Sequence, residues 1–76
     1  MKELILEYVK KELVKGTDID EKTPLISSSM IDSISTLQLV DFLEKNFSIE
    51  FLPHEVDRDN LDTVEKMISF LSSKKS

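Results

Sequence analysis

The fold is decided by a stretch in the middle of the chain that contains a helical pattern and the few residues before it. It reads Met30-Ile31-Asp32-Ser33-Ile34-Ser35-Thr36-Leu37-Gln38-Leu39-Val40-Asp41-Phe42-Leu43-Glu44-Lys45-Asn46-Phe47. Apolar residues recur there with the 3.6-residue period of an α-helix, which predicts a helix from about Ser33 to Phe47. One face is an ordinary core stripe made of Thr36, Leu39, Val40, Leu43 and Phe47. A second face starts with two apolar residues and continues as a polar surface, made of Ile34, Leu37, Gln38, Asp41 and Lys45.

Helical patterns also open and close the chain. The first is predicted from Lys2 to Val14, and Gly16 follows it where a helix end favours a residue that tolerates positive φ. Its apolar stripe consists of Ile5, Tyr8, Val9 and Leu13. The last helix is predicted to begin near Asp62 or Thr63. Its apolar stripe consists of Val64, Met67, Ile68 and Leu71.

Finer features are expected at both ends of this last helix. Asp62 and Glu65 have the spacing of a capping-box variant. Residues 72–76 are expected to fray. Ahead of the helix, Pro53 can occupy the first turn of a short helix, predicted to cover roughly Pro53 to Asp59.

The segment between the first two predicted helices has no periodicity but contains several apolar residues: Ile19, Leu25, Ile26, Met30 and Ile31. A loop this long within a compact domain is usually functional or disordered, and the apolar residues favour a packed, functional loop. No stretch shows the alternation of a β-strand. The chain is therefore predicted to be an all-α bundle of three principal helices and one short helix, in a single domain over residues 1–76.

Composition excludes several classes of function. The chain has 76 residues and no cysteine, so it has no disulfide framework and no thiolate metal site. The net charge of −5 argues against a nucleic-acid binder and against docking on anionic lipid, and favours partners with basic surfaces. Charged residues interrupt any signal-peptide core in the first fifteen positions, and no run approaches the roughly 20 apolar residues of a membrane span. We expect a monomeric, cytoplasmic protein.

The Asp32-Ser33-Ile34 core and the closing Glu44-Lys45-Asn46-Phe47 resemble the attachment site of the acyl and peptidyl carrier proteins. The resemblance covers nearly the whole chain and implies a four-helix carrier-protein bundle without catalytic activity or a resident metal. It implies that Ser33 bears a covalent 4′-phosphopantetheine arm donated by coenzyme A. Asp32 would support the transfer by helping to hold a transient Mg²⁺. The arm would supply the thiol that the chain lacks and carry acyl or aminoacyl groups as thioesters.

The resemblance also implies the partners of the chain. These are a phosphopantetheinyl transferase, an acyl- or aminoacyl-loading ligase or transferase, and downstream acyl-processing enzymes. The site departs from the fatty-acid type, since Ser29-Met30-Ile31 stands where a glycine usually precedes Asp-Ser. Met30-Ile31-Asp32-Ser33 is nearer the D-alanyl and peptidyl type. A specialised pathway is therefore favoured over bulk fatty-acid synthesis.

Docking of partners is predicted on two neighbouring surfaces. Ile34 and Leu37 lie off the core stripe and are expected to be exposed, with Asp41 on the same face; the alternative is that the two apolar residues pad the preceding loop. Acids outnumber bases after the second helix, where Arg58 is the one base from Glu50 to Glu65. Basic partners are expected to be steered there by Glu55, Asp57 and Asp59.

Other interpretations of the same residues were weighed. A calcium loop starting at Asp18 fails because Thr23 stands where glycine is required. A hydrolase needs a base beside Ser33, and the single histidine, His54, is not part of a Gly-x-Ser-x-Gly turn. The remaining alternative is a small helical interaction module in which Ser33 is only a helix cap.

Overall fold

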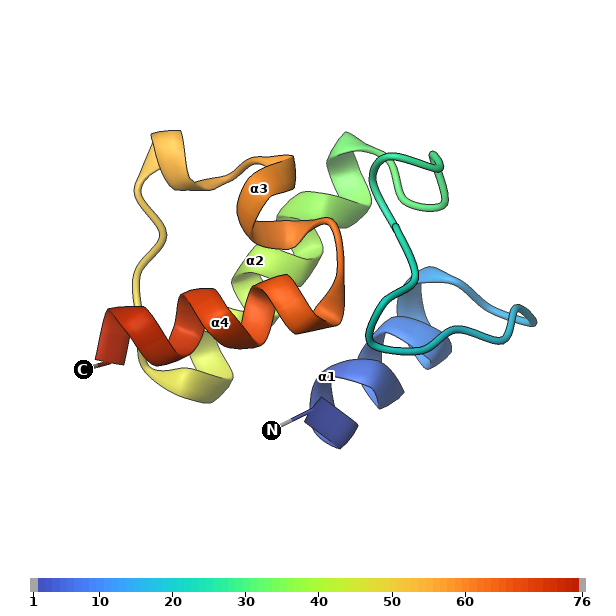
Figure 1. Cartoon of the computed structure of the whole chain (residues 1–76), viewed down its shortest axis with the longest axis horizontal. Helices are drawn as coiled ribbons and strands as arrows, with labels where there is room; N and C mark the ends of the chain where they lie inside the picture. Colours follow the sequence, from blue (N-terminus) through green and yellow to red (C-terminus); the bar gives the residue numbers. More distant parts are fainter. Residues whose placement is uncertain (1, 76) are drawn as a thin grey trace.

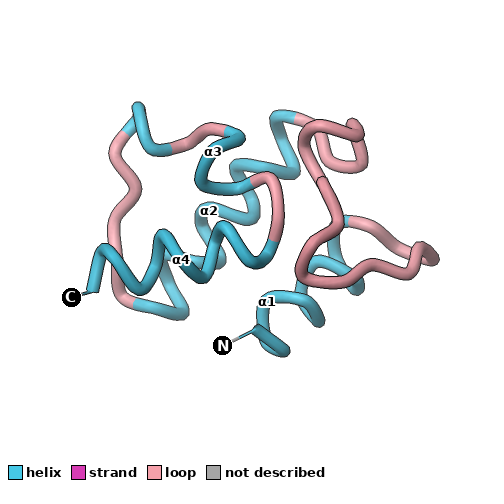
Figure 2. The backbone as a smooth tube through the Cα atoms, in the orientation of Figure 1, coloured by secondary structure: helices cyan, strands magenta, loops and turns pink. Residues whose placement is uncertain are grey.

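Helices and connecting loops make up all of residues 2–75, which the computed structural model describes (Figure 1). In chain order they are α1 (Lys2–Tyr8), the π-helical η1 (Val9–Leu13), α2 (Ser33–Phe47), the 3₁₀ turn η2 (Pro53–Glu55), α3 (Arg58–Leu61) and α4 (Val64–Lys75). No strand occurs within these residues, which confirms the predicted all-α class. A long loop separates η1 from α2 and is drawn in pink in Figure 2.

The core forms where the predicted apolar stripes meet. Its buried side chains come from the helices and from both long connections: Ile5, Val9, Val14, Ile19, Leu25, Ile31, Leu39, Val40, Leu43, Phe51, Leu61, Val64, Met67 and Leu71. Stacked rings extend it, since Tyr8 lies on Phe42 with ring centroids 3.9 Å apart and Phe51 lies on Phe70 at 4.8 Å. The α4 helix contacts both α1 and α3, so the last helix packs against the first helix and against the short helix before it.

The first helix ends differently from the prediction, which extended an α-helix to Val14. Its last turn is the π-helical η1, and the Val14 N–H donates to the Val9 carbonyl at 2.8 Å. This wider i→i+5 turn brings Val14 to nearly the same side as Val9, and both side chains are buried. Gly16 has φ of 79°, as its place after a helix end predicted.

The short helix near Pro53 is two separate turns. The prediction of one helix from Pro53 to Asp59 is wrong, because η2 ends at Glu55 and α3 begins at Arg58. Asp57 lies between them in extended conformation, and its side chain accepts a hydrogen bond from the Asn60 N–H at 3.2 Å. Aspartate is a better N-cap than interior helix residue, so Asp57 divides the segment.

The predicted fraying of residues 72–76 is also corrected, because α4 continues to Lys75. Lys74 holds the end of the helix in place. Its Nζ lies 2.6 Å from Glu55 Oε1 and 5.5 Å from the centre of the Phe70 ring. Ser76 lies outside the described residues.

Asp62 has a role that the capping-box prediction missed. Thr63 caps α4 instead, because its Oγ1 accepts a hydrogen bond from the Lys66 N–H at 3.0 Å. The Asp62 carboxylate is buried and turns toward the long loop. It accepts hydrogen bonds from the backbone N–H groups of Ile26 and Ser27, both at 2.9 Å, and from the Ser27 hydroxyl at 2.7 Å.

Backbone bonds complete this attachment of the loop. The Leu25 N–H donates to the Asp62 carbonyl at 2.7 Å, and the Glu65 N–H donates to the Glu21 carbonyl at 2.9 Å. The side chains of Ile19, Leu25 and Ile31 are buried beneath it, which confirms that the loop is packed. We call Asp62 with Ile26 and Ser27 the loop latch. Residues 28–32 connect this latch to the start of α2.

Candidate functional site

Asp32 is the N-cap of α2. Its backbone is extended, and its Oδ1 accepts a hydrogen bond from the Ser35 N–H at 2.8 Å. This bond, together with a bond from the Ser35 hydroxyl, lowers the pKa of Asp32 below its ordinary value. The carboxylate is exposed and is therefore anionic at neutral pH. Asp32 therefore caps α2, and the interpretation of Ser33 as only a helix cap loses its main support.

Ser33 is the first residue of α2 and is exposed. Its hydroxyl has no hydrogen-bond partner within residues 2–75, whereas two nearby serines are engaged in the loop. The Ser27 hydroxyl donates to Asp62, and the Ser28 hydroxyl donates to the Pro24 carbonyl. The backbone N–H groups at the start of α2 also make this end of the helix favourable for negative charge. The arrangement can therefore accept an anionic group on Ser33 from an outside enzyme.

The backbone just before this site adopts an unusual conformation. Ser29 has φ of 63°, in the left-handed region that glycine enters without steric cost. The sequence lacks the glycine that usually precedes Asp-Ser in carrier proteins. The chain nevertheless makes a turn of the kind that favours glycine in this stretch, and it does so with a serine.

An open pocket of about 550 Å³ adjoins Ser33. The end of the long loop, the start of α2 and the segment leading into α3 line it together. Its apolar walls are the side chains of Ile26, Ile31, Leu37 and Val56, and its charged groups are Asp32, Asp57 and Arg58. In the sequence, Arg58 stands out only as a lone base among acids. No local pattern could have placed it beside Ser33, because the two residues belong to different helices.

The predicted docking residues of α2 lie on its outer face. Ile34 is 69% exposed and Leu37 is 62% exposed, so neither pads the loop as the alternative proposed. Asp41 is exposed as well, and its Oδ2 lies 3.1 Å from Lys45 Nζ. The exposure of this face is established, while its docking role stays a prediction.

The three acids predicted to steer partners have different surroundings. Glu55 differs from expectation, because its side chain is only 18% exposed and its Oε1 binds Lys74 Nζ and the Leu52 N–H. The hydrogen bond from Lys74 is the largest cause of its lowered pKa. Asp57 is exposed but caps α3. Asp59 is exposed, and its side chain has no hydrogen bond or ion pair with the part of the chain that the structure describes.

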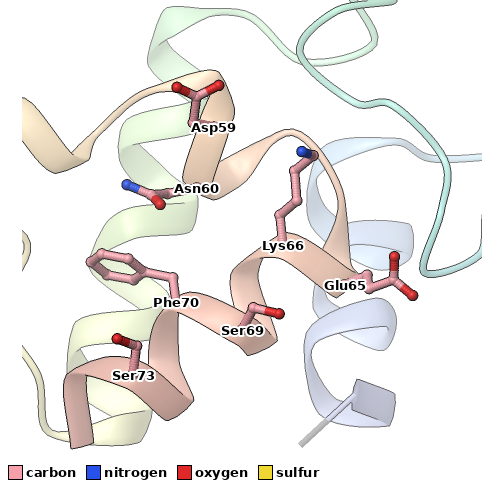
Figure 3. A pocket seen from close by; sticks show the side chains of 7 residues that line it. All are labelled: Asp59, Asn60, Glu65, Lys66, Ser69, Phe70 and Ser73. Carbon is pink, nitrogen blue, oxygen red and sulfur yellow. The ribbon is translucent and has the colours of Figure 1, made fainter.

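A second pocket, of about 330 Å³, lies between α3 and α4 and shares no lining residue with the Ser33 pocket. Figure 3 shows Asp59 at its α3 side and Lys66, Phe70 and Ser69 on α4. No chemistry at Ser33 draws on this second pocket. The described helices include none that is long and apolar enough to cross a membrane.

A small helical domain that presents one open serine beside an aspartate at a helix start has the features of a carrier domain. No protein-family model matches the chain. Several curated proteins are similar to the chain. A D-alanyl carrier protein of Lactococcus lactis is 33% identical over 78 residues, covering 99% of this chain and 96% of the relative. An acyl carrier protein of Buchnera aphidicola is also 33% identical, over 75 residues, covering 92% of this chain and 91% of the relative.

A probable acyl carrier protein of a Serratia species, PigG, is 24% identical and covers 95% of this chain. These relatives match over almost their full lengths. The chain belongs to the acyl carrier protein family, which includes proteins of the D-alanyl type. The resemblance inferred from Asp32-Ser33-Ile34 is thereby confirmed at the level of the family.

Proposed function

We propose that the chain carries acyl or aminoacyl groups on a 4′-phosphopantetheine arm attached to Ser33. The observation that carries the proposal is the exposed Ser33 hydroxyl at the first residue of α2, next to Asp32 and without a hydrogen-bond partner among residues 2–75. Membership in a family of carrier proteins supports it. The open pocket beside Ser33 leaves room for a long substituent.

The attachment step is a phosphoryl transfer to the serine oxygen. Ser33 Oγ forms a bond to the pantetheine-bearing phosphorus of coenzyme A, and the bond from that phosphorus to the adenosine bisphosphate breaks. The hydroxyl proton passes to a base of the transferase, and His54, the single histidine, is not among the residues that line the Ser33 pocket. Asp32 presents a carboxylate beside the reacting oxygen, where it can share a transient Mg²⁺ with the transferase.

The chain would then act as a carrier without catalysing the reactions of its cargo. The arm supplies a terminal thiol that holds the cargo as a thioester, and the chain itself has no cysteine for that task. Ile34 and Leu37 offer exposed apolar area to the transferase, to a loading ligase or transferase, and to acyl-processing enzymes. The name of the Lactococcus relative and the Met30-Ile31-Asp32-Ser33 sequence favour a specialised pathway of the D-alanyl or peptidyl kind. The monomeric state and the cytoplasmic location stay predictions.

Mass spectrometry tests the attachment directly. The purified chain is incubated with coenzyme A, Mg²⁺ and a phosphopantetheinyl transferase of broad specificity. We expect a gain of one phosphopantetheine in the wild type and in Ser35→Ala, and none in Ser33→Ala. Circular dichroism should show the same helical content in all three proteins. Modification of the Ser33→Ala variant, or none in the wild type, would contradict the proposal.

A further inference from the structure

Three charged side chains line the pocket beside Ser33, and only one of them is positive. Asp32 and Asp57 are its carboxylates, and Arg58 is its single cation. Both carboxylates have backbone partners, since Asp32 binds the Ser35 N–H and Asp57 binds the Asn60 N–H. Arg58 is exposed, and none of the ion pairs among the described residues involves its guanidinium. The pocket thus contains a cation whose charge is not used within the fold.

The backbone of Arg58 is held in place although its side chain is not paired. Asp57 caps the helix that Arg58 begins, and the Arg58 carbonyl accepts a hydrogen bond from the Asp62 N–H at 3.0 Å. Asp62 also forms the loop latch that leads to the start of α2. Asp62 therefore links α3, through the Arg58 carbonyl, to the loop that leads to Ser33.

Attachment of the arm changes the charge balance of this pocket. A phosphodiester on Ser33 adds a permanent negative charge beside Asp32 and Asp57. Three negative charges in one small pocket repel each other unless a cation offsets them. A guanidinium presents planar, forked N–H donors that match phosphate oxygens better than the point charge of a lysine does.

We propose that the Arg58 guanidinium binds the phosphodiester through which the arm is attached to Ser33. The inference rests on the proposed function and adds a second point of contact between the chain and the arm. Arg58 thereby joins α3 to the modified end of α2. It also restricts the directions in which the arm leaves the surface.

Nuclear magnetic resonance of the modified protein tests this contact. In the wild type, the Arg58 Nε–H resonance should shift between the unmodified and modified forms. In modified Arg58→Gln, the ³¹P resonance of the phosphodiester should move by more than its line width, and in Arg58→Lys by less. Lys66→Gln is the matched control, because it removes one positive charge at the other pocket (Figure 3) and should leave the ³¹P resonance unchanged.

The outcomes separate this inference from the function on which it rests. Mass spectrometry first establishes whether Ser33 carries the arm. If it does not, both the carrier function and the Arg58 contact are disproved. If the arm is present but the Arg58 Nε–H resonance does not shift, the contact is disproved and the carrier function stands. The same holds if Arg58→Gln and Lys66→Gln give the same ³¹P spectrum. The wild-type measurement needs no variant, so a poorly folded variant leaves the test intact.

Discussion

The loop latch and the open start of α2 lie at the two ends of residues 26–33. At both, an aspartate accepts hydrogen bonds from backbone N–H groups, but the latch fixes the loop and the start of α2 leaves a serine exposed. At the latch, the buried Asp62 carboxylate accepts three hydrogen bonds from Ile26 and Ser27. At the start of α2, the exposed Asp32 accepts hydrogen bonds from Ser35, three residues on, and leaves the next residue, Ser33, open. Both aspartates satisfy backbone N–H groups, and only Asp62 does so across the fold.

The difference shows how a loop without a periodic pattern can present an exposed serine at a defined place. The loop has no periodic pattern of its own, so a distant carboxylate holds it in place. Six residues after Ser27 the chain reaches Ser33, where almost nothing covers the side chain. The hydrogen bonds that hold the loop therefore lie before the site, and the exposed side chain lies at the site. Matched residues on the two sides make this comparison testable.

Two leucines of α2 give the largest expected contrast. Leu39 is fully buried, and Leu39→Ala should lower the free energy of unfolding by about 2–5 kcal/mol. Leu37 is 62% exposed, so Leu37→Ala should leave the melting temperature nearly unchanged while slowing modification and processing by partner enzymes. Thermal denaturation and transferase kinetics on both variants provide the measurement. A large drop in melting temperature for Leu37→Ala would show that Leu37 belongs to the core.

The two aspartates give the next largest effect. Asp62→Ala removes the charged acceptor of the part-buried N–H donors of Ile26 and Ser27, and should lower the free energy of unfolding by about 1–3 kcal/mol. Asp32→Ala removes an exposed cap and should cost less stability, yet it should slow phosphopantetheine transfer more. Urea denaturation and mass-spectrometric transfer rates check this crossed pattern. Equal losses of stability and transfer rate in both variants would remove the distinction between the two regions.

The stability that Asp62 contributes should depend on pH. Burial raises the pKa of Asp62, but the hydrogen bonds from Ser27 and Ile26 outweigh burial and lower it overall. Since the folded state then binds its proton less readily than the unfolded chain, the contribution is present at neutral pH. It is lost as the pH falls below the ordinary aspartate value of about 3.9 toward the lowered pKa.

Asp62→Asn reports this contribution by comparison with the wild type. The difference in unfolding free energy between the two proteins should be largest near neutral pH and should shrink in acid. Other acids titrate in both proteins and largely cancel in the difference. Urea denaturation at several pH values measures it. A difference that stays constant from neutral pH down to pH values below about 3.9 would show that the Asp62 charge has no part in the latch.

The smallest effect is expected on association rates. Glu55 and Asp57 have structural tasks, so Asp59 is the suitable position for testing electrostatic steering. Asp59→Lys should slow association with a basic partner at low salt. Glu3→Lys on α1 alters the net charge of −5 by the same amount and serves as the control. Stopped-flow rates at low salt and at about 0.15 M, where screening acts beyond about 8 Å, provide the measurement. Equal slowing by both variants would mean that only net charge matters.

Local sequence determined α2 and the place of Ser33 at its start. The α2 helix has the predicted bounds, Ser33 and Phe47, because its apolar period and the Asp32 cap act within a few residues. The same locality placed Ile34 and Leu37 outside the core stripe and put Ser33 at a helix start. The family followed from Asp32-Ser33-Ile34 and the closing Phe47, which are also local.

Tertiary structure alone decided how the pieces are held together. Asp62 bonds to Ser27 across 35 residues of chain, and a local pattern at Asp62 suggested a cap instead. The pairing of Glu55 with Lys74 and the position of Arg58 at the same pocket as Ser33 were likewise hidden. Helix patterns are set by bonds between near neighbours, whereas these contacts form only after the buried stripes have brought distant segments together.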